Sequence, residues 1–291
     1  MSQELWKPTL NGTTALEKLQ SDKGCESYSA LHQWSMNNPG EFWSRAWDDN
    51  SVIGSKGSIF YKEGADFISS QFFPEARLNV AENLLAHGEP DQVAIVSILE
   101  TGVRSEITWA ELRIKVAATA AAMRAEGVVS GDRVVAWVPN VAETVIYALG
   151  ALSIGAVVST ASPDFAPHAV EDRFGQVEPK LLLAADGYHY NGKYFDCAEK
   201  SAEIEKLLPT LKKSVRISQF DEWIKPFIGS AANYEQLPFD HPGFVLFSSG
   251  TTGKPKCITH SGAGVMLKAQ SELLYQFNIT KGNKVFFFTT C

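Results

Sequence analysis

The spacing of apolar side chains changes near residue 92 and divides the chain into two parts. Before this point apolar residues recur at helical spacing, at Tyr28, Leu31 and Trp34 and again at Phe42, Trp43 and Trp47. The pattern predicts two aromatic-rich helices, the second entered through Asn38 as N-cap and Pro39 as first helical residue. We expect this pair to cover the edge of a larger domain, with an aromatic ligand pocket as the alternative. Residues 72–85 predict a further amphipathic element.

From residue 92 onward short apolar runs alternate with longer amphipathic segments. The runs that predict strands span residues 92–99, 103–109, 132–138, 156–162, 180–186 and 243–247. The segments that predict helices span residues 109–127, 141–155, 166–179 and 195–208. This alternation indicates an α/β fold in which helices flank a largely parallel sheet. Such sheets bind ligands beyond the carboxyl ends of their strands, where we expect the loops 162–165, 185–193 and 248–256.

The same pattern divides the chain into three segments. Residues 1–27 are polar and carry no sustained period, so we expect a poorly ordered lead. Residues 28–86 are expected to form a helical N-terminal cap, and residues 87–291 the α/β domain. Residues 283–291, NKVFFFTTC, predict a buried strand with no later element to cover it. Because a complete domain rarely ends on such a strand, we expect a truncated domain, the front part of a longer protein.

An uncharged segment from Thr144 to Pro163 is long enough to cross a bilayer. It is rich in alanine, glycine and serine rather than leucine or phenylalanine, and Gly150 and Gly155 interrupt it. A buried helix that runs into a buried parallel strand explains the same composition. We therefore predict no membrane span, with a membrane segment as the alternative.

The amino-acid composition and net charge indicate a globular protein and limit the kinds of partner it can bind. The chain has 291 residues, of which 45% are hydrophobic and 20% are charged, as in an ordinary globular protein. Its formal net charge of −7 argues against a large basic surface, and so against nucleic acid as a partner. Widely spaced cysteines fit reduced thiols, with Cys257 expected to be buried. The N-terminus lacks a signal-peptide pattern, so we expect a cytoplasmic protein of the cytosol.

The stretch FSSGTTGKPK, residues 247–256, places glycines, hydroxyl groups and lysines directly after a predicted buried strand. Gly250 and Gly253 allow positive φ and a close approach to a ligand, so successive N–H groups can form an anion nest. The other polar groups are the hydroxyls of Ser248, Ser249, Thr251 and Thr252 and the ammonium groups of Lys254 and Lys256. These groups bind phosphate oxygens, so the loop is suited to a polyphosphate. A generic polar surface turn is the alternative.

The loop differs from a Walker A motif. That motif needs four residues between its glycines and a Ser or Thr after its lysine. Here two residues separate Gly250 from Gly253, and Pro255 follows Lys254. Since Pro255 disfavours helix at Lys254, we expect the loop not to open a helix.

FSSGTTGKPK resembles the signature phosphate loop of adenylate-forming enzymes, the superfamily of acyl-CoA synthetases, luciferases and peptide-synthetase adenylation domains. Further stretches are similar to the acetyl- and acetoacetyl-CoA synthetase branch: SYSALHQWS, ARLNVAENLL, STASPDF, VEDRFGQVEPKLL, YNGK, YEQLPFDHP and SSGTTGKPKCITHSGAG. The similarity runs from about Tyr28 to the last residue. Within the branch, SPDF in place of a Gly-Gly-Phe turn and Cys257 in place of glycine favour acetoacetate as the acid.

The resemblance implies an acid–thiol ligase. ATP and a β-keto acid would form an acyl-adenylate and pyrophosphate, and the CoA thiol would then displace AMP to give the thioester. The substrates would be acetoacetate, ATP and CoA, with Mg²⁺ neutralising the polyphosphate. The role would be the use of ketone bodies for lipid synthesis. A related short-chain acyl-CoA synthetase and a non-catalytic truncated product are the alternatives.

The resemblance also assigns residues. Residues 248–254 and Lys256 would hold the β- and γ-phosphates, with Thr251 and Thr252 as the main hydroxyl donors. The turn of Tyr190, Asn191, Gly192 and Lys193 lies where related synthetases bind CoA with two basic residues. Only Lys193 is basic here, and a solvated lysine is the alternative. The family's adenylation lysine lies beyond residue 291, and no residue here is assigned to a metal, so we expect the chain alone to be inactive.

Single residues near these loops have structural alternatives. His260 and Asp164 are placed to approach a ligand, yet a hydrogen-bonded histidine and an ordinary Ser-Pro-Asp turn explain them equally simply. His168 is expected in the first turn of its helix. Asp172 and Arg173 are expected to form a solvated ion pair.

Overall fold

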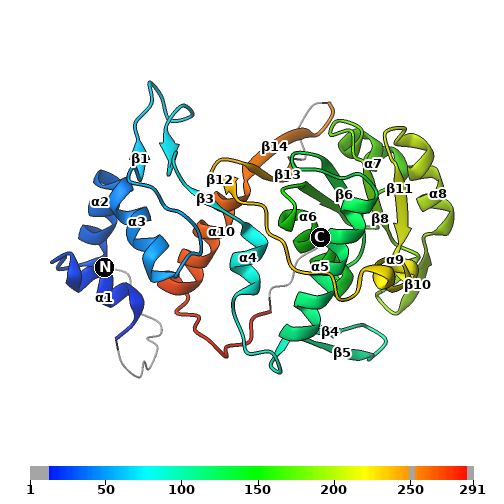
Figure 1. Cartoon of the computed structure of the whole chain (residues 1–291), viewed down its shortest axis with the longest axis horizontal. Coiled ribbons are helices and arrows are strands. Elements are labelled where there is room, and N and C mark those ends of the chain that lie inside the picture. The colour runs from blue at the N-terminus through cyan, green and yellow to red at the C-terminus, as the bar shows by residue number, and fades with distance from the viewer. Residues whose placement is uncertain (1–12, 249–252, 287–291) are drawn as a thin grey trace.

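The computed structural model describes residues 13–248 and 253–286 of the chain. Its main feature is a six-stranded sheet in the order β11-β8-β6-β7-β13-β14. The strands are β11 (Lys213–Arg216), β8 (Leu181–Ala184), β6 (Arg133–Trp137), β7 (Val157–Ala161), β13 (Pro242–Ser248) and β14 (Lys256–Ser261). All neighbours pair in parallel except β13 and β14, which form an antiparallel hairpin (Figure 1). The predicted α/β fold is therefore confirmed.

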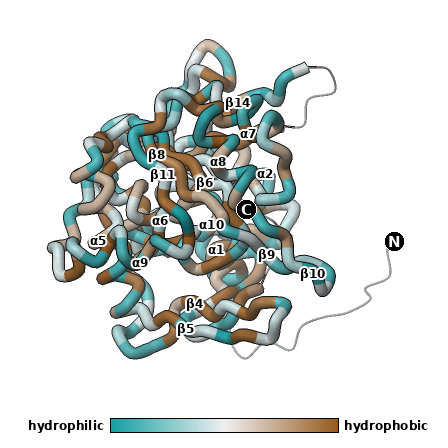
Figure 2. Tube along the Cα trace, turned by 90° about the vertical axis from the view of Figure 1, so that its right-hand side faces the viewer, coloured by the Kyte–Doolittle hydropathy of each residue, from teal (hydrophilic) through white to brown (hydrophobic). Residues whose placement is uncertain are grey.

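The central strands β8, β6 and β7 are buried on both faces of the sheet, and alternate residues of β6 show how. Val134 and Ala136 join the core shared with α5 (Trp109–Ala125) and α6 (Ala142–Ser153). Val135 and Trp137 join the second core, under α7 (Pro167–Phe174) and α8 (Ala198–Leu207). Figure 2 shows the hydrophobic central strands inside the molecule. Because both faces are covered, the strands read as continuous apolar runs, as the sequence pattern required.

The uncharged segment that was long enough for a membrane forms α6 followed by β7. This confirms the prediction of a buried helix running into a buried strand. Among the described residues, none of the helices has the length and apolar character needed to cross a bilayer.

The cap contains the predicted helix pair, α2 (Tyr28–Asn37) and α3 (Pro39–Asp49). Its buried aromatic rings pack on one another: Phe73 lies 5.1 Å from Trp47 and 4.9 Å from Phe239, centroid to centroid. These contacts favour the covering role over the ligand pocket. The amphipathic element expected at residues 72–85 is divided, because only α4 (Val80–Leu85) is helical. Before α4 the chain forms the end of β2 (Gln71–Phe72), which pairs with β1 (Tyr61–Lys62), and β3 (Arg77–Leu78), which pairs with β12 (Leu237–Pro238).

The expectation of a poorly ordered lead over residues 1–27 is wrong for residues 15–22, which form α1 (Ala15–Asp22). Thr14 and Glu17 form a capping box that satisfies the first main-chain N–H groups of this helix. Leu19 is fully buried and anchors the helix in the core. Residues 1–12 lie outside the described part of the chain.

Two hairpins project from the α/β domain. The first is β4 (Val93–Ile98) with β5 (Arg104–Thr108), as predicted. The second is β9 (Gly187–Tyr190) with β10 (Lys193–Asp196), where the sequence reading expected a loop followed by a longer helix. The helix begins only at Ala198, because residues 193–196 pair with β9 instead.

After β14 the chain forms α10 (Gly262–Ser271) and the π-helical turn η3 (Glu272–Gln276); the remaining elements are α9 (Phe220–Ile224), η1 (Ile217–Gln219) and η2 (Lys225–Phe227). The buried strand expected at residues 283–291 is wrong for its described part. Residues 283–286 have no strand partner, and Val285 and Phe286 are 61% and 87% exposed. Residues 287–291 lie outside the described part of the chain.

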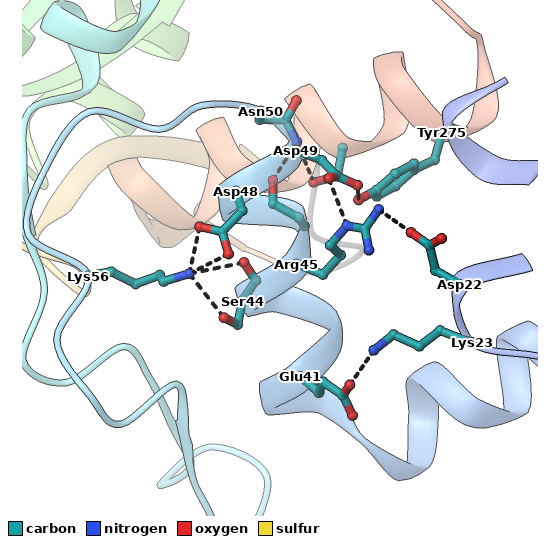
Figure 3. Close-up of polar contacts among 12 residues, drawn as sticks. Asp22, Lys23, Glu41, Ser44, Arg45, Asp48, Asp49, Asn50, Lys56 and Tyr275 are labelled. Carbon is teal, nitrogen blue, oxygen red and sulfur yellow. Dashed lines mark hydrogen bonds and ion pairs between the residues drawn. The ribbon is translucent and has the colours of Figure 1, made fainter. Parts of the chain in front are cut away.

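Polar side chains join the two ends of the described chain (Figure 3). Arg45 of α3 forms ion pairs with Asp22 at 2.8 Å and with Asp49 at 2.7 Å. Because Asp22 is the last residue of α1, the first pair connects α1 to α3. The Tyr275 hydroxyl of η3 donates to Asp49 Oδ2 at 2.8 Å. Asn50 reaches Ser271 Oγ at 3.4 Å. The N-terminal helices are thus fixed to a segment more than 200 residues away, with separations of 226 and 221 residues.

This network makes a pH dependence testable. Burial and the hydrogen bond to Asp49 raise the pKa of Tyr275 above its ordinary value. Above pH ~10 the unfolded phenol ionises while the folded one does not, so stability present below that pH is lost as pH rises. Above this pH, we expect the free energy of unfolding of Tyr275→Phe to fall less steeply with pH than that of wild type, by up to about 1.4 kcal/mol per pH unit. Urea unfolding at pH 9, 10 and 11 measures this dependence, with Tyr28→Phe, at an exposed tyrosine, as control. The same change of unfolding free energy with pH in wild type, Tyr275→Phe and Tyr28→Phe would contradict the prediction.

Candidate functional site

The predicted phosphate loop joins β13 to β14 at the top of Figure 1. β13 pairs in parallel with its neighbour β7. Phe244 lies opposite Val158, and the buried Ser159 hydroxyl donates to the Val245 carbonyl at 2.7 Å. At the far end of the hairpin Ser248 lies opposite Lys256, so these residues form the base of the loop. The loop therefore follows the carboxyl end of a sheet strand, where ligands of α/β proteins bind.

Helix α7 supports the loop from the side. Gln176, two residues past the end of α7, donates from Nε2 to the Pro255 carbonyl at 2.9 Å. Lys254 Nζ lies 3.9 Å from Asp172 Oδ1. The Lys254 side chain is 74% exposed, so this ion pair is weak and leaves the ammonium group accessible to an anionic ligand. Gln176 fixes the main chain, whereas Lys254 stays available.

The structure describes half of the predicted phosphate-binding residues. Ser248, Gly253, Lys254 and Lys256 surround the loop, while Ser249, Gly250, Thr251 and Thr252 lie outside the described residues. Gly253 has φ of +107°, a conformation that side chains rarely adopt, and a Cβ there would meet nothing within 4 Å. Glycine is thus required by the backbone and not by lack of space. Strand β14 follows Pro255, which confirms that this loop opens no helix.

Other predicted residues around the loop have mixed outcomes. Cys257 is exposed, which corrects the expectation of burial, because it lies on β14 at the edge of the sheet. Asp172 forms the expected solvent-exposed ion pair, but its partner is Lys254 and not Arg173. Arg173 instead lies over the Phe165 ring, 4.5 Å from its centroid.

Three further predicted residues are placed as follows. His168 is the second residue of α7, as expected, and its Nδ1 lies 3.2 Å from Glu171 Oε2. His260 lies opposite Phe244, at the end of the hairpin away from the loop, so its approach to phosphate stays a prediction. Burial, and to a smaller extent the charge of Asp164, raise the pKa of Tyr188, and the approach of Asp164 to a ligand stays a prediction.

The second predicted site is the tip of the β9–β10 hairpin, lower in Figure 1 than the phosphate loop. Tyr190 lies opposite Lys193, and the turn between them has φ of +51° at Asn191 and +72° at Gly192. Positive φ at both central residues is typical of a type I′ turn. Both Tyr190 and Lys193 are exposed, so an aromatic ring and a cation flank the turn.

Sequence reasoning missed two residues of these sites. Gln176 supports the phosphate loop, and Glu100 accepts hydrogen bonds from the Asn191 and Gly192 amides at 3.1 and 3.2 Å. Their partners lie 79 and 91–92 residues away, so no local pattern signals them. Among the described residues no group of three or more His, Cys, Asp or Glu is arranged to hold a metal ion.

A mostly parallel sheet with a glycine-containing polar connection after β13, next to its edge strand, defines the class of α/β proteins that bind ligands beyond the carboxyl ends of their strands. Residues 85–290 match the family model "AMP-binding enzyme", and residues 28–84 match "Acetyl-coenzyme A synthetase N-terminus". The chain belongs to the AMP-binding enzyme family.

Individual relatives narrow the resemblance. The chain is 41% identical to the acetoacetyl-coenzyme A synthetase of Rhizobium meliloti (strain 1021), covering 91% of this chain and 43% of that protein. It is 32% identical to malonamoyl-CoA synthetase vrtB of Penicillium aethiopicum, covering 99% and 44%. The solved acetoacetyl-CoA synthetase from Streptomyces lividans superposes with a TM-score of 0.85 at 36% identity, covering 91% and 43%. The predicted resemblance is confirmed, and the chain spans less than half the length of these relatives.

Proposed function

We propose that the chain supplies the phosphate-binding and CoA-binding parts of a ligase that activates acetoacetate. ATP and acetoacetate form acetoacetyl-adenylate and pyrophosphate, and CoA then displaces AMP to give acetoacetyl-CoA. The observation that carries the proposal is the likeness to acetoacetyl-CoA synthetases in sequence and in structure. Residues 28–86 serve as the cap and residues 87–291 as the incomplete adenylation domain.

The phosphate hairpin suits the first half-reaction. Ser248, Gly253, Lys254 and Lys256 border the loop that holds the β- and γ-phosphates, together with Ser249, Gly250, Thr251 and Thr252. A carboxylate is a poor acyl donor, and the adenylate converts one of its oxygens into part of a good leaving group. The lysines offset the polyphosphate charge, and Gln176 fixes the Pro255 carbonyl between them. Mg²⁺ binds largely through the phosphates of the nucleotide, as it commonly does in such enzymes.

The β9–β10 hairpin suits the second half-reaction. Lys193 offers a positive charge to a CoA phosphate, and Tyr190, 62% exposed, offers a ring on which the adenine base can stack. Asn191 and Gly192 complete the turn between them. An aromatic residue thus stands where related synthetases have a second basic residue.

The remaining features of the proposal concern the setting. Small molecules are the ligands, nucleic acid is not a partner, and the place of action is the cytosol, where ketone bodies are used for lipid synthesis. The net charge of −7 supports the exclusion of nucleic acid. The chain covers 43% of the length of the acetoacetyl-coenzyme A synthetase of Rhizobium meliloti, so the overall reaction is proposed for the whole enzyme.

A second candidate is the activation of another short acid. The malonamoyl-CoA synthetase among the relatives shows that proteins similar to this chain differ in the acid named for them. Malonamate and acetoacetate share a three-carbon 1,3-dicarbonyl core, so a pocket for one is chemically close to a pocket for the other.

The test joins residues 1–291 to the uncovered part of an acetoacetyl-CoA synthetase and, separately, to that of a malonamoyl-CoA synthetase, and measures acid-dependent ATP–pyrophosphate exchange. We expect acetoacetate to be preferred over malonamate, acetate and butyrate in the first fusion, and the preference for acetoacetate over malonamate in the second fusion to exceed that of the malonamoyl-CoA synthetase itself. Lys256→Met should raise the KM for ATP about tenfold, because a charged hydrogen bond to phosphate is lost. Exposed Lys206→Met on α8 is the matched control. Preference for acetate, or an unchanged KM in Lys256→Met, would contradict the proposal.

A further inference from the structure

The tip of the β9–β10 hairpin already holds an anion. Glu100 Oε1 accepts from the Asn191 amide at 3.1 Å, and Glu100 Oε2 accepts from the Gly192 amide at 3.2 Å. Each carboxylate oxygen therefore takes one of two successive main-chain N–H groups. Successive amides that converge on one point form a nest that binds anions, and many phosphate sites are built in this way.

Glu100 is brought there by the β4–β5 hairpin. Residues 99–103 form its tip, which is closed by hydrogen bonds from Leu99 N to Val103 O and from Gly102 N to Leu99 O, both 2.9 Å. The residues that meet at this contact are far apart in sequence, at separations of 91 and 92. The contact is the result of how two separate hairpins lie together, and it places a negative charge on the turn.

From this geometry we infer that Glu100 is an internal competitor for the phosphate group bound by the β9–β10 turn, and that a phosphate ligand displaces it. The inference rests on the proposed role of Tyr190–Lys193 in CoA binding and adds a residue that sets the strength of that binding. A carboxylate and a phosphate cannot accept from the same two N–H groups at once. Their like charges also repel at this separation.

Displacement is sterically simple. Glu100, Asn191, Gly192 and Lys193 are all exposed, so the carboxylate can turn into solvent without opening the core. Lys193 follows the two amides directly and supplies the cation that favours a doubly charged phosphate over a singly charged carboxylate. The turn thus has the donors and the neighbouring charge for phosphate, and Glu100 holds the donors when phosphate is absent.

The experiment compares wild type, Glu100→Gln, Glu106→Gln and Lys193→Ala of the 291-residue chain by isothermal titration with CoA, with 3′-dephospho-CoA and with inorganic phosphate. Glutamine keeps the shape of Glu100 but removes its charge. Glu106 lies in the same β4–β5 hairpin and pairs with Arg104, away from the turn, so Glu106→Gln is a matched control for charge. Circular dichroism verifies that each variant is folded.

We expect Glu100→Gln to bind CoA about five- to tenfold more tightly, with Glu106→Gln unchanged and Lys193→Ala weaker. If the turn binds the 3′-phosphate of CoA, Glu100→Gln should bind 3′-dephospho-CoA no more tightly than wild type does. If the turn binds the diphosphate, the tighter binding by Glu100→Gln should persist with 3′-dephospho-CoA. Tighter binding of inorganic phosphate by Glu100→Gln supports the inference in either case. Equal or weaker CoA binding by Glu100→Gln, while Lys193→Ala still weakens it, would overturn the inference and leave the proposed CoA site standing. CoA binding that is insensitive to Lys193→Ala would overturn the proposed site itself.

A second measurement does not depend on affinity. In a ¹H–¹⁵N correlation NMR spectrum, addition of CoA should shift the main-chain amide signals of Asn191 and Gly192 in wild type, because their hydrogen-bond acceptor changes from carboxylate to phosphate. The shifts should appear at lower CoA concentration in Glu100→Gln. Unmoved Asn191 and Gly192 signals at saturating CoA would show that Glu100 is not displaced, and would overturn the inference.

Discussion

Replacing Asn79 by alanine is expected to lower the free energy of unfolding by about 3–4 kcal/mol. Asn79 is fully buried just before α4, and its Nδ2 donates to three carbonyls, those of Leu152 at 3.0 Å, Ser153 at 3.1 Å and Glu235 at 2.9 Å. Its Oδ1 also accepts from the Glu82 amide at 3.1 Å and caps α4. One side chain therefore joins the cap, the end of α6 and the segment before β12, and alanine removes all four hydrogen bonds.

Asn79→Asp separates these contributions. Aspartate keeps the N-cap acceptor but turns the three donated contacts into contacts between a carboxylate and carbonyl oxygens. We expect it to be at least as damaging as alanine. The exposed Asn37→Ala is the control and should change stability by no more than about 0.5 kcal/mol. Urea unfolding followed by fluorescence measures all three; a tolerated Asn79→Asp would show that the cap alone matters.

Gly243→Ala is expected to cost about 3 kcal/mol or more. A Cβ at Gly243 would lie 2.4 Å from the Gly262 Cα and 2.9 Å from the Gly262 nitrogen. Both atoms belong to the main chain, so no side chain can rotate away to relieve the overlap. Gly243 is the second residue of β13 and Gly262 directly follows β14, so the two glycines let the ends of the hairpin approach closely.

The glycines of this region provide a graded series. A Cβ at Gly262 would come within 3.1 Å of Val80 Cγ2 and 3.2 Å of Gly243 Cα, so Gly262→Ala should be less damaging than Gly243→Ala. Gly264 lies in the same helix with its nearest contact, Ser261 Oγ, at 3.2 Å, and alanine has a helix propensity about 1 kcal/mol better than glycine. Gly264→Ala should therefore be close to neutral. Thermal unfolding gives the order, and a Gly243→Ala protein as stable as Gly264→Ala would contradict it.

The sequence predicted those parts of the fold that arise from local pattern. The alternation from residue 92 onward identified the sheet and its flanking helices, because strands buried on both faces are continuous apolar runs. Two local signals were present but not used. Thr14 and Glu17 have the spacing of a capping box and mark α1, and Asn191-Gly192 between aromatic residues marks the β9–β10 hairpin.

The long-range contacts that position the phosphate loop and the β9–β10 turn could not be predicted from the sequence. Gln176 and Glu100 act through main-chain groups of distant loops, and a main-chain acceptor or donor has no residue type by which it can be recognised. Exposure of Cys257 likewise depends on its position in the edge strand of the sheet. The motif FSSGTTGKPK could be interpreted because its glycine spacing and Pro255 are local properties.

The polar network of α1, α3 and η3 has a consequence for synthesis of the protein. Asp49 meets Tyr275 across 226 residues, so the N-terminal helices leave the ribosome long before their partner exists. At ~5–20 residues per second, roughly 10–50 s separate the two events. During that interval α3 already has its contacts with Phe72 and Phe73, but Phe42 still lacks Tyr275 and Trp47 still lacks Phe239. The first-made helices of this chain therefore complete their packing only after most of the chain has been synthesised.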